Sequence, residues 1–150
     1  MLLSKSCVYG LRATLYLASI QDENYTSIRK LSDKLDISFH FLTKILQQLT
    51  AADLMESMTG PKGGVRLSRP GGSITLLDIV VAIDGDDLLT ECVLGLPGCG
   101  KEKPCPMHEQ WKTMRTEITK MLGGTDLNEM ADKGKDMNLR ITADGTFSWE

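Results

Sequence analysis

Apolar residues recur three and four positions apart through the first fifty positions of the chain, which predicts three helices. Thr26 and Ser38 stand at the starts of the second and third helices, where a side-chain oxygen can cap free backbone amides. Asp36 lies in the short link between them and tolerates a left-handed backbone. Such a link between two amphipathic helices is typical of a helix-turn-helix. The apolar positions of the three helices are Val8, Leu11, Leu15 and Ala18, then Ile28, Leu31 and Leu35, then Leu42, Ile45, Leu46 and Leu49.

The pattern changes after this third helix. Residues 54–59 and 65–68 predict two short strands, and the intervening residues 60–64 are a glycine-rich tip. A compact apolar helix is predicted over 75–83, started by Thr75 and ending near Gly85. The order of helix, helix-turn-helix and hairpin predicts a mainly α-helical fold with a small β-hairpin wing, which is a winged helix-turn-helix.

A loop and a long helix are expected in the second half of the chain. Five glycine and proline residues interrupt residues 92–105, so no regular element is predicted there. In the helix that follows, apolar side chains recur every 3.5 residues up to Gly123, which is typical of a seam between associating helices. A C-terminal dimerisation helix is therefore expected, with a short helix after it at 125–131. The seam residues are Met107, Trp111, Met114, Ile118 and Met121.

Composition and charge narrow the class of protein. The 150 residues are 41% apolar and 25% charged, which is ordinary for one soluble globular domain. Because no apolar run reaches the length of a membrane span and the first residues lack a secretory signal, we expect a cytoplasmic protein without membrane contact. Residues 1–72 carry nine basic and six acidic side chains, whereas residues 73–150 carry eight and fourteen. The first half is therefore where any polyanionic partner is expected to bind.

Polar side chains in this first half suggest DNA as that partner. The start of the second helix of a helix-turn-helix faces base edges in the major groove. The amides at the start of the preceding helix suit a phosphate, and a glycine-rich wing can approach a groove closely. The candidate DNA-binding residues are Thr26, Ser27, Ser38, His40, Thr43, Lys44, Lys62, Gly63 and Arg66.

Three of the four cysteines fall in the predicted loop. They are Cys92, Cys99 and Cys105, and His108 follows the last of them by three residues. A loop with so few apolar residues needs a cross-link to hold one shape, and a stable disulfide is disfavoured in the cytosol. The wide, Pro- and Gly-rich spacing favours an iron–sulfur cluster over zinc, while redox-active thiols and the absence of any role stay open. Cys7 is interpreted as a small buried apolar residue.

Taken together, these segments resemble the Rrf2 family of small bacterial winged-helix transcription regulators. The resemblance covers about residues 1–125, and the family includes iron–sulfur biogenesis regulators, nitric-oxide sensors and cysteine-metabolism repressors. The matching segments are LLSKSCVYGLRATLYLA, IRKLSDKLDISFHFLTKILQQLTAADL, GPKGGVRLSRP and ITLLDIVVAIDG, followed by the three loop cysteines.

The resemblance implies a homodimer that binds a double-stranded DNA operator with dyad symmetry. In cluster-bearing members three loop cysteines ligate iron, and by position these are Cys92, Cys99 and Cys105. His108 stands where the biogenesis regulators have their fourth ligand. Val8 stands where nitric-oxide sensors have an acidic ligand, so a Cys3His site is expected. A 2Fe–2S cluster is favoured, with a 4Fe–4S cluster as the alternative, and either can be lost from an aerobic sample.

The predicted organisation has four parts. They are a winged helix-turn-helix DNA-binding domain at 1–85, a cysteine-rich sensor loop at 86–105, the dimerisation helix with a short following helix at 106–131, and a tail at 132–150. The hypothesis is a transcriptional repressor or activator that senses iron–sulfur, redox or nitric-oxide status. The alternatives are a cluster-free regulator switched by thiol oxidation or a protein partner, and a zinc-stapled protein-interaction module. No catalytic motif is present, so enzymatic activity is not expected.

Overall fold

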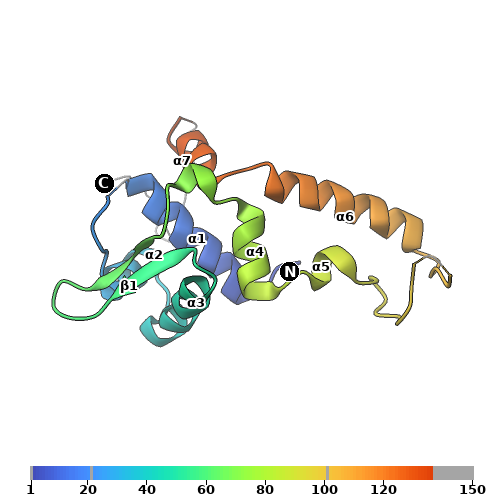
Figure 1. The fold of residues 1–150 in the computed structure, drawn as a ribbon, viewed down its shortest axis with the longest axis horizontal. Coiled ribbons are helices and arrows are strands. Elements are labelled where there is room, and N and C mark those ends of the chain that lie inside the picture. Colours follow the sequence, from blue (N-terminus) through green and yellow to red (C-terminus); the bar gives the residue numbers. More distant parts are fainter. Residues whose placement is uncertain (1, 21, 101, 137–150) are drawn as a thin grey trace.

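A helical body with a β-hairpin and an arm that projects from it make up the computed structural model (Figure 1). It describes residues 2–20, 22–100 and 102–136. The elements in chain order are α1 (Lys5–Ile20), α2 (Ile28–Leu35), α3 (Phe39–Ala51), β1 (Met55–Met58), β2 (Gly64–Leu67), the 3-10 turn η1 (Gly71–Ser73), α4 (Leu76–Asp84), α5 (Asp87–Thr90), α6 (His108–Gly123) and α7 (Leu127–Asp136). The predicted tail lies outside the described residues from position 137 onward. None of the described helices is long and apolar enough to cross a membrane.

Helices α2 and α3 form the predicted helix-turn-helix. Ser38 caps α3 by accepting a backbone N–H at 3.4 Å, as predicted. Asp36 has φ 52° and ψ 51°, which confirms the left-handed link. The prediction that Thr26 caps α2 is wrong, because Ser27 is the cap and its hydroxyl accepts the N–H of Lys30 at 3.1 Å.

Thr26 is held instead by the hairpin. Its N–H donates to the carbonyl of Val65 at 2.8 Å, and its own carbonyl accepts the N–H of Val65 at 2.9 Å. Both residues are buried. This long-range pairing keeps Thr26 out of α2, so the helix cap falls one residue later. It also fixes the position of the wing relative to the helix-turn-helix.

The hairpin confirms the predicted wing. Strands β1 and β2 are antiparallel, with Met55 opposite Leu67 and Met58 opposite Gly64. Gly64 has φ 153°, and a Cβ at this position would overlap the backbone carbonyl of Thr26. The residue therefore has to be glycine for two reasons, its backbone conformation and its close contact with the segment before α2.

The core lies where α1, α3 and α4 cross. The apolar stripe predicted for α3 is buried, as is Ile79 of α4. Thr75 starts α4 with reciprocal hydrogen bonds to Asp78, and Gly85 ends it, as predicted. Gly10 of α1 faces this crossing, where a Cβ would overlap the side chain of Ile83, so its lack of a side chain allows α4 to approach α1 closely.

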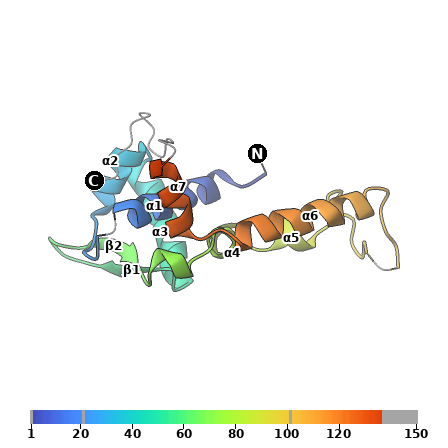
Figure 2. The same cartoon turned by 90° about the horizontal axis from the view of Figure 1, so that it is seen from above.

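The arm consists of α5, the cysteine loop and α6. Figures 1 and 2 show α6 extending away from the body with α5 alongside it. Two side chains of α6 hold the end of α5: the indole N–H of Trp111 donates to the carbonyl of Glu91 at 2.9 Å, and Arg115 donates to the carbonyl of Thr90 at 2.7 Å. The four-residue α5, which the sequence pattern did not predict, therefore depends on these contacts with α6.

The chain then returns from the arm to the body. The N–H of Leu76 donates to the carbonyl of Thr125, and the N–H of Leu127 donates to the carbonyl of Ile74, both at 3.0 Å. Helix α7 packs on α1, with Leu127 and Ala131 buried. The helix expected at 125–131 is present and continues to Asp136. It completes the body rather than extending the arm.

We expect Gly64→Ala to lower the free energy of unfolding by about 1–3 kcal/mol, because alanine is strained at this positive φ and its methyl group meets the Thr26 carbonyl. The midpoint of urea unfolding measures the change. Gly72→Ala is the matched control, since a Cβ at Gly72 makes only ordinary contact, and the midpoint should stay close to that of the wild type. Equal midpoints for the Gly64 variant and the wild type would contradict the proposed tight contact.

Candidate nucleic-acid interface and metal centre

A groove of about 740 Å³ separates α3 from the hairpin. It is lined mainly by apolar and hydroxyl-bearing side chains, and none of the described residues that line it is acidic. The other face of the hairpin borders a pocket of about 470 Å³ that includes Asp22, Glu23 and Glu56 together with Arg66 and Arg69. Side chains alternate between the two faces of a strand, so the hairpin separates a pocket that carries both acidic and basic side chains from a groove whose described lining has no acidic residue. The groove is the side that suits a polyanion.

The candidate reading residues surround the start of α3. Ser38, His40 and Lys44 are exposed, while Thr43 is partly buried and lines the groove. The Thr43 hydroxyl donates to the carbonyl of Phe39 at 2.7 Å. The structure therefore brings these four predicted residues to one end of the helix-turn-helix.

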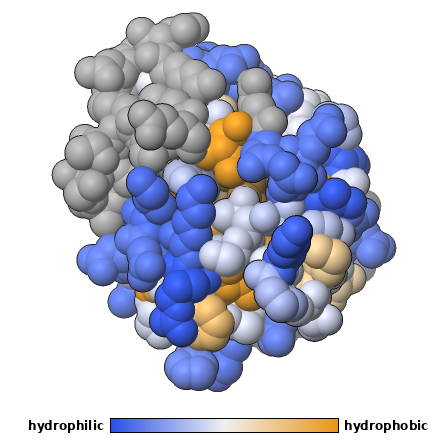
Figure 3. All heavy atoms as spheres, turned by 90° about the vertical axis from the view of Figure 1, so that its left-hand side faces the viewer, coloured by the Kyte–Doolittle hydropathy of each residue, from blue (hydrophilic) through white to orange (hydrophobic). Residues whose placement is uncertain are grey.

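The remaining candidates lie on the segment before α2 and on the wing. Ser27 is exposed and lines the groove, whereas Thr26 is buried and paired with Val65 of β2. Lys62 is exposed in the hairpin tip, and Gly63 next to it lines the groove. The end of the molecule that carries the hairpin is mainly hydrophilic, with only small apolar patches (Figure 3).

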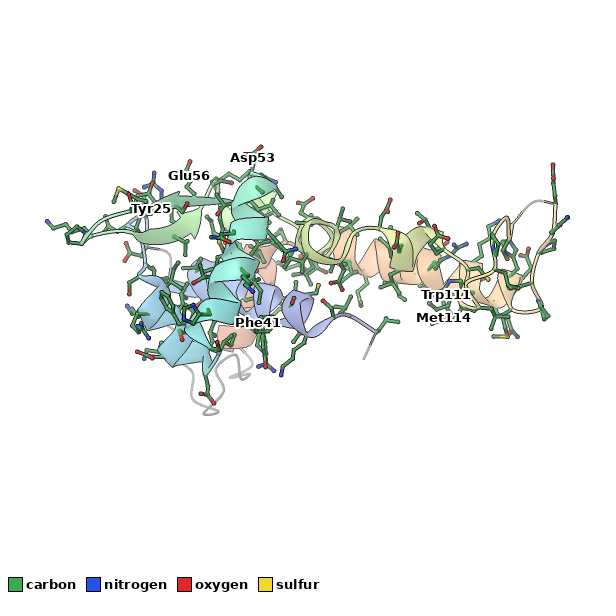
Figure 4. The ribbon with its side chains drawn as sticks, turned by 90° about the horizontal axis from the view of Figure 1, so that it is seen from below. Tyr25, Phe41, Asp53, Glu56, Trp111 and Met114 are labelled. Atoms are coloured by element: carbon green, nitrogen blue, oxygen red, sulfur yellow. The ribbon has the colours of Figure 1, made fainter. Side chains whose placement is uncertain are left out.

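Arg66 is engaged within the protein. Its Nε lies 2.9 Å from the carboxylate of Glu56, and its Nη1 donates to the carbonyl of Glu23 at 3.0 Å. Its guanidinium carbon lies 4.4 Å from the centre of the Tyr25 ring. Figure 4 shows Tyr25 and Glu56 at the base of the hairpin. In this arrangement Arg66 joins the wing to the segment before α2.

Arg29 is a cation at the groove that the sequence analysis missed. It is exposed at the second position of α2, and its guanidinium carbon lies 4.4 Å from the ring centre of Phe39. The two residues are ten positions apart, so no helical or strand periodicity links them. The only sequence signal for Arg29 was that it is a basic residue in the first turn of α2, the first helix of the helix-turn-helix.

The three loop cysteines come together at the far end of the arm. The sulfurs of Cys92, Cys99 and Cys105 all lie within 4.8 Å of one another, and those of Cys92 and Cys105 are 3.4 Å apart. Cys99 Sγ lies 3.6 Å from Nδ1 of His108, the first residue of α6. Thiolates that share one zinc ion sit about 2.3 Å from it, and hence within roughly 4 Å of one another. The spacing of this donor set therefore fits a single thiophilic metal ion, and cysteine and histidine are also the residue types that ligate iron–sulfur clusters.

The thiols of the chain differ in acidity. Backbone N–H groups of Leu96 and Leu94 donate to Cys92 and lower its pKa to about 7. Burial, followed by its contact with Cys92, raises the pKa of Cys105. Burial raises the pKa of Cys7 to about 12, and its side chain is fully inaccessible, which confirms the interpretation of Cys7 as a buried apolar residue. The thiolate form is therefore favoured at Cys92 and disfavoured at Cys105 and Cys7.

The structure divides the predicted seam into exposed and partly buried side chains. Met107, Met114 and Met121 have exposed fractions of 43%, 54% and 60%, which is high for large apolar side chains. Trp111 and Ile118 are partly buried, and Ile118 packs against the core. Figure 4 shows Trp111 and Met114 far along the arm from the helix-turn-helix. The seam thus has exposed apolar surface along the full length of the helix.

A winged helix-turn-helix that carries a separate thiol-rich site is the architecture of a DNA-binding regulator. Residues 3–133 match the Rrf2 family, described as "Iron-dependent Transcriptional regulator". The chain belongs to this family, as the sequence resemblance implied. Rrf2 proteins are transcription regulators that bind DNA, and the chain is accordingly a transcriptional regulator rather than an enzyme.

Individual relatives agree with this assignment. The HTH-type transcriptional regulator IscR of Xenorhabdus nematophila is 30% identical over 122 residues, which cover 81% of this chain and 74% of that protein. CymR, the global cysteine regulator of B. subtilis, has a TM-score of 0.74 at 25% identity, covering 87% of this chain and 95% of that one. IscR of T. potens has the same TM-score at 21% identity, covering 91% and 90%, and shows the likeness of fold alone.

In metal-free, reduced protein we expect alkylation by iodoacetamide to discriminate between Cys92 and Cys7. The thiolate is the reactive form, so the rate at Cys92 should rise with pH through a midpoint near its pKa of about 7. Cys7 should stay unmodified at neutral pH because it is buried and its pKa is raised to about 12. Peptide mass spectrometry at several pH values measures both rates. Equal rates at the two residues near pH 7 would contradict these environments.

Proposed function

We propose that the chain acts in the cytoplasm as a homodimeric transcriptional regulator whose cysteine loop holds an iron–sulfur cluster. The observation that carries the proposal is the meeting of Cys92, Cys99, Cys105 and His108 at the start of the helix that bears the apolar seam. One helix then connects the sensing site to the dimer interface and, through α4 and α7, to the DNA-binding body.

The acid-free groove and the exposed start of α3 support DNA binding by the first 85 residues. Ser38, His40 and Thr43 are the proposed base-reading residues, because they lie where the second helix of this motif meets the major groove. Ser27, Lys44, Lys62 and Gly63 are proposed to contact the backbone of an operator with dyad symmetry. Arg66 would contribute by fixing the wing, since its guanidinium already has partners in the protein.

The geometry of the loop supports Cys92, Cys99 and Cys105 as cysteine ligands with His108 as the fourth. When bound, an iron–sulfur cluster would supply a redox- and nitric-oxide-sensitive cross-link, and 2Fe–2S is the form we favour. The protein's own contribution is local order. The N–H of His108 donates to the carbonyl of Cys105 at 3.0 Å, so the last cysteine directly precedes the first turn of α6. Ligation of both residues would fix where that helix begins.

A fixed start of α6 would influence the dimer. Met107 at that start and the loop residues Val93, Leu94 and Leu96 are all exposed and apolar. Ordering the loop would decide which of these side chains join the dimer interface. The interface in turn sets the distance between the two helix-turn-helix motifs of the dimer, which must match DNA half-sites about one helical turn apart. A bias of a few kcal/mol between dimer geometries is sufficient to shift the population appreciably.

One observation favours thiol switching as a second candidate. Cys92 and Cys105 are 3.4 Å apart, and the pKa of Cys92 is lowered to about 7, so an oxidant could link them without a large movement of the loop. Both candidates use the same cysteines and the same dimer. Metal content separates them.

We expect protein purified without oxygen to contain iron and acid-labile sulfide and to show a visible charge-transfer band. Replacing Cys92, Cys99 and Cys105 together by serine should remove all three signals. Cys7→Ala is the matched control, since that cysteine is buried in the body, and it should retain them. Zinc without iron would indicate a structural zinc site in the loop, and the absence of any metal would favour thiol switching. Either result would overturn the cluster.

We expect Met114→Glu to weaken the dimer at least about ten-fold, because it places an unpaired charge in the apolar seam. Sedimentation at several protein concentrations measures the dissociation constant. Thr116→Glu introduces the same charge at an exposed position of α6 outside the seam and should leave the dimer intact. A dimer equally stable in both variants would show that the seam is not the interface.

A further inference from the structure

We propose that Arg29, held by stacking on Phe39, binds a DNA backbone phosphate at the edge of the groove. Phe39 is then a positioning residue that keeps the guanidinium in place. This inference rests on the proposed DNA-binding function and adds to it a residue pair that connects the two helices of the helix-turn-helix.

The stack connects the starts of two helices. Arg29 is the second residue of α2 and Phe39 is the first residue of α3, and 4.4 Å separates the guanidinium carbon from the ring centre. Phe39 is only partly exposed, and its ring meets that of His40 edge-on at 5.8 Å. The aromatic ring is therefore supported from the side of the reading helix. A cation over such a ring is attracted by it and loses conformational freedom before any ligand arrives.

Arg29 is distinguished from the other described arginines by its polar partners. Arg66, Arg69 and Arg115 each donate hydrogen bonds to carbonyl or carboxylate oxygens of the protein. Arg12 and Arg29 make no such hydrogen bond within the described residues. Arg29 stacks on Phe39, and Arg12 lies over Tyr9, away from the groove lining. Among the residues that the structure describes, Arg29 is thus the arginine that both lines the groove and keeps its hydrogen-bond donors for a ligand.

The charge of the groove indicates a polyanion as that ligand. None of the described lining residues is acidic, whereas the pocket on the opposite side of the hairpin includes Asp22, Glu23 and Glu56 beside Arg66 and Arg69. Duplex DNA is the polyanion that the family binds. In a helix-turn-helix the first helix crosses the DNA backbone while the second reads base edges. Arg29 belongs to the first helix, so its planar donors are placed for a phosphate, which they can bind in a bidentate manner.

Binding measurements with two labelled duplexes test the proposal. One duplex is enriched from a random pool by the wild-type protein, and the other has the same composition in scrambled order. Arg29→Ala should weaken binding to both duplexes by the same factor, about ten-fold, and reduce the slope of log affinity against log salt by about 1. Arg29→Lys keeps the charge, so it should retain the slope while it loses part of the affinity.

A mutant cycle tests the role of Phe39. Phe39→Leu should weaken binding about three-fold in the wild-type background and have no effect in the Arg29→Ala background. Phe39→Tyr keeps an aromatic ring and should retain the affinity that Phe39→Leu loses. A general packing role for Phe39 would not predict this difference. Additive effects of Phe39→Leu and Arg29→Ala would overturn the positioning role.

Arg12→Ala is the matched control, since this arginine also stacks on a ring but lies outside the groove lining, and its salt slope should equal that of the wild type. An equal loss in the Arg12 and Arg29 variants would overturn the proposal in favour of a general charge effect. A loss confined to the enriched duplex would overturn it in favour of base reading.

The test also separates this inference from the function on which it rests. Replacing Ser38, His40 and Thr43 together should abolish the preference for the enriched duplex. If that occurs while Arg29→Ala does not change binding, the proposed phosphate contact of Arg29 is wrong, and base recognition by the start of α3 is retained. If the wild-type protein binds neither duplex, or the triple variant keeps its preference, the proposed function fails and this inference fails with it.

Discussion

Two backbone hydrogen bonds, between Thr26 and Val65, set the geometry on which the DNA-binding end depends. A two-stranded hairpin has little stability by itself in water, so the wing needs an attachment to the body. The pairing supplies this attachment and leaves an acid-free groove between β2 and α3. Gly64 permits the close approach, and Arg66 with Glu56 and Tyr25 supports the other face of the hairpin. Reading helix and wing are thereby held as one surface.

At the other end of the molecule, the thiol cluster lies directly before α6, the helix that carries the exposed methionines of the seam. Because His108 is both the proposed fourth ligand and the first residue of that helix, a change at the loop cannot leave the start of the seam unaffected. Trp111 and Arg115 transmit the same dependence to α5 through hydrogen bonds to Glu91 and Thr90. The arm is therefore a connected structure in which loop, short helix and long helix constrain one another.

Local signals were sufficient to predict much of the body. The spacing of Leu42, Ile45, Leu46 and Leu49 identified the buried face of α3, and the caps Ser38 and Thr75 identified helix starts, because periodicity and capping act within one turn. The cap of α2 was predicted one residue too early because a long-range contact, and not a local signal, decides its position. Thr26 and Ser27 are both good caps, and only the pairing of Thr26 with Val65, nearly forty positions away, decides between them.

The candidate functional residues also divide into those that local sequence signals predict and those that depend on contacts between distant segments. The proximity of the three loop cysteines and His108 was predicted from residue type and order, because these residues are close together in the chain. Arg29 was missed because its partner Phe39 belongs to another helix. Arg66 was assigned to DNA without its internal partners, although a correct hairpin register would have placed Glu56 directly opposite. Helix α5 is too short to have a periodicity, and its contacts come from α6.

The way in which the arm joins the body has a consequence for how such proteins change over time. The arm leaves the body after α4, and the chain returns at the pair of hydrogen bonds between Ile74–Leu76 and Thr125–Leu127, so α5, the cysteine loop and α6 are topologically an insertion between α4 and α7 of the body. Residues could be added to or removed from α6 and from the segment before it, or the cysteine loop could be exchanged for another. Helix α7 would stay packed on α1. Signal reception and operator recognition can therefore diversify as separate modules of a single short chain.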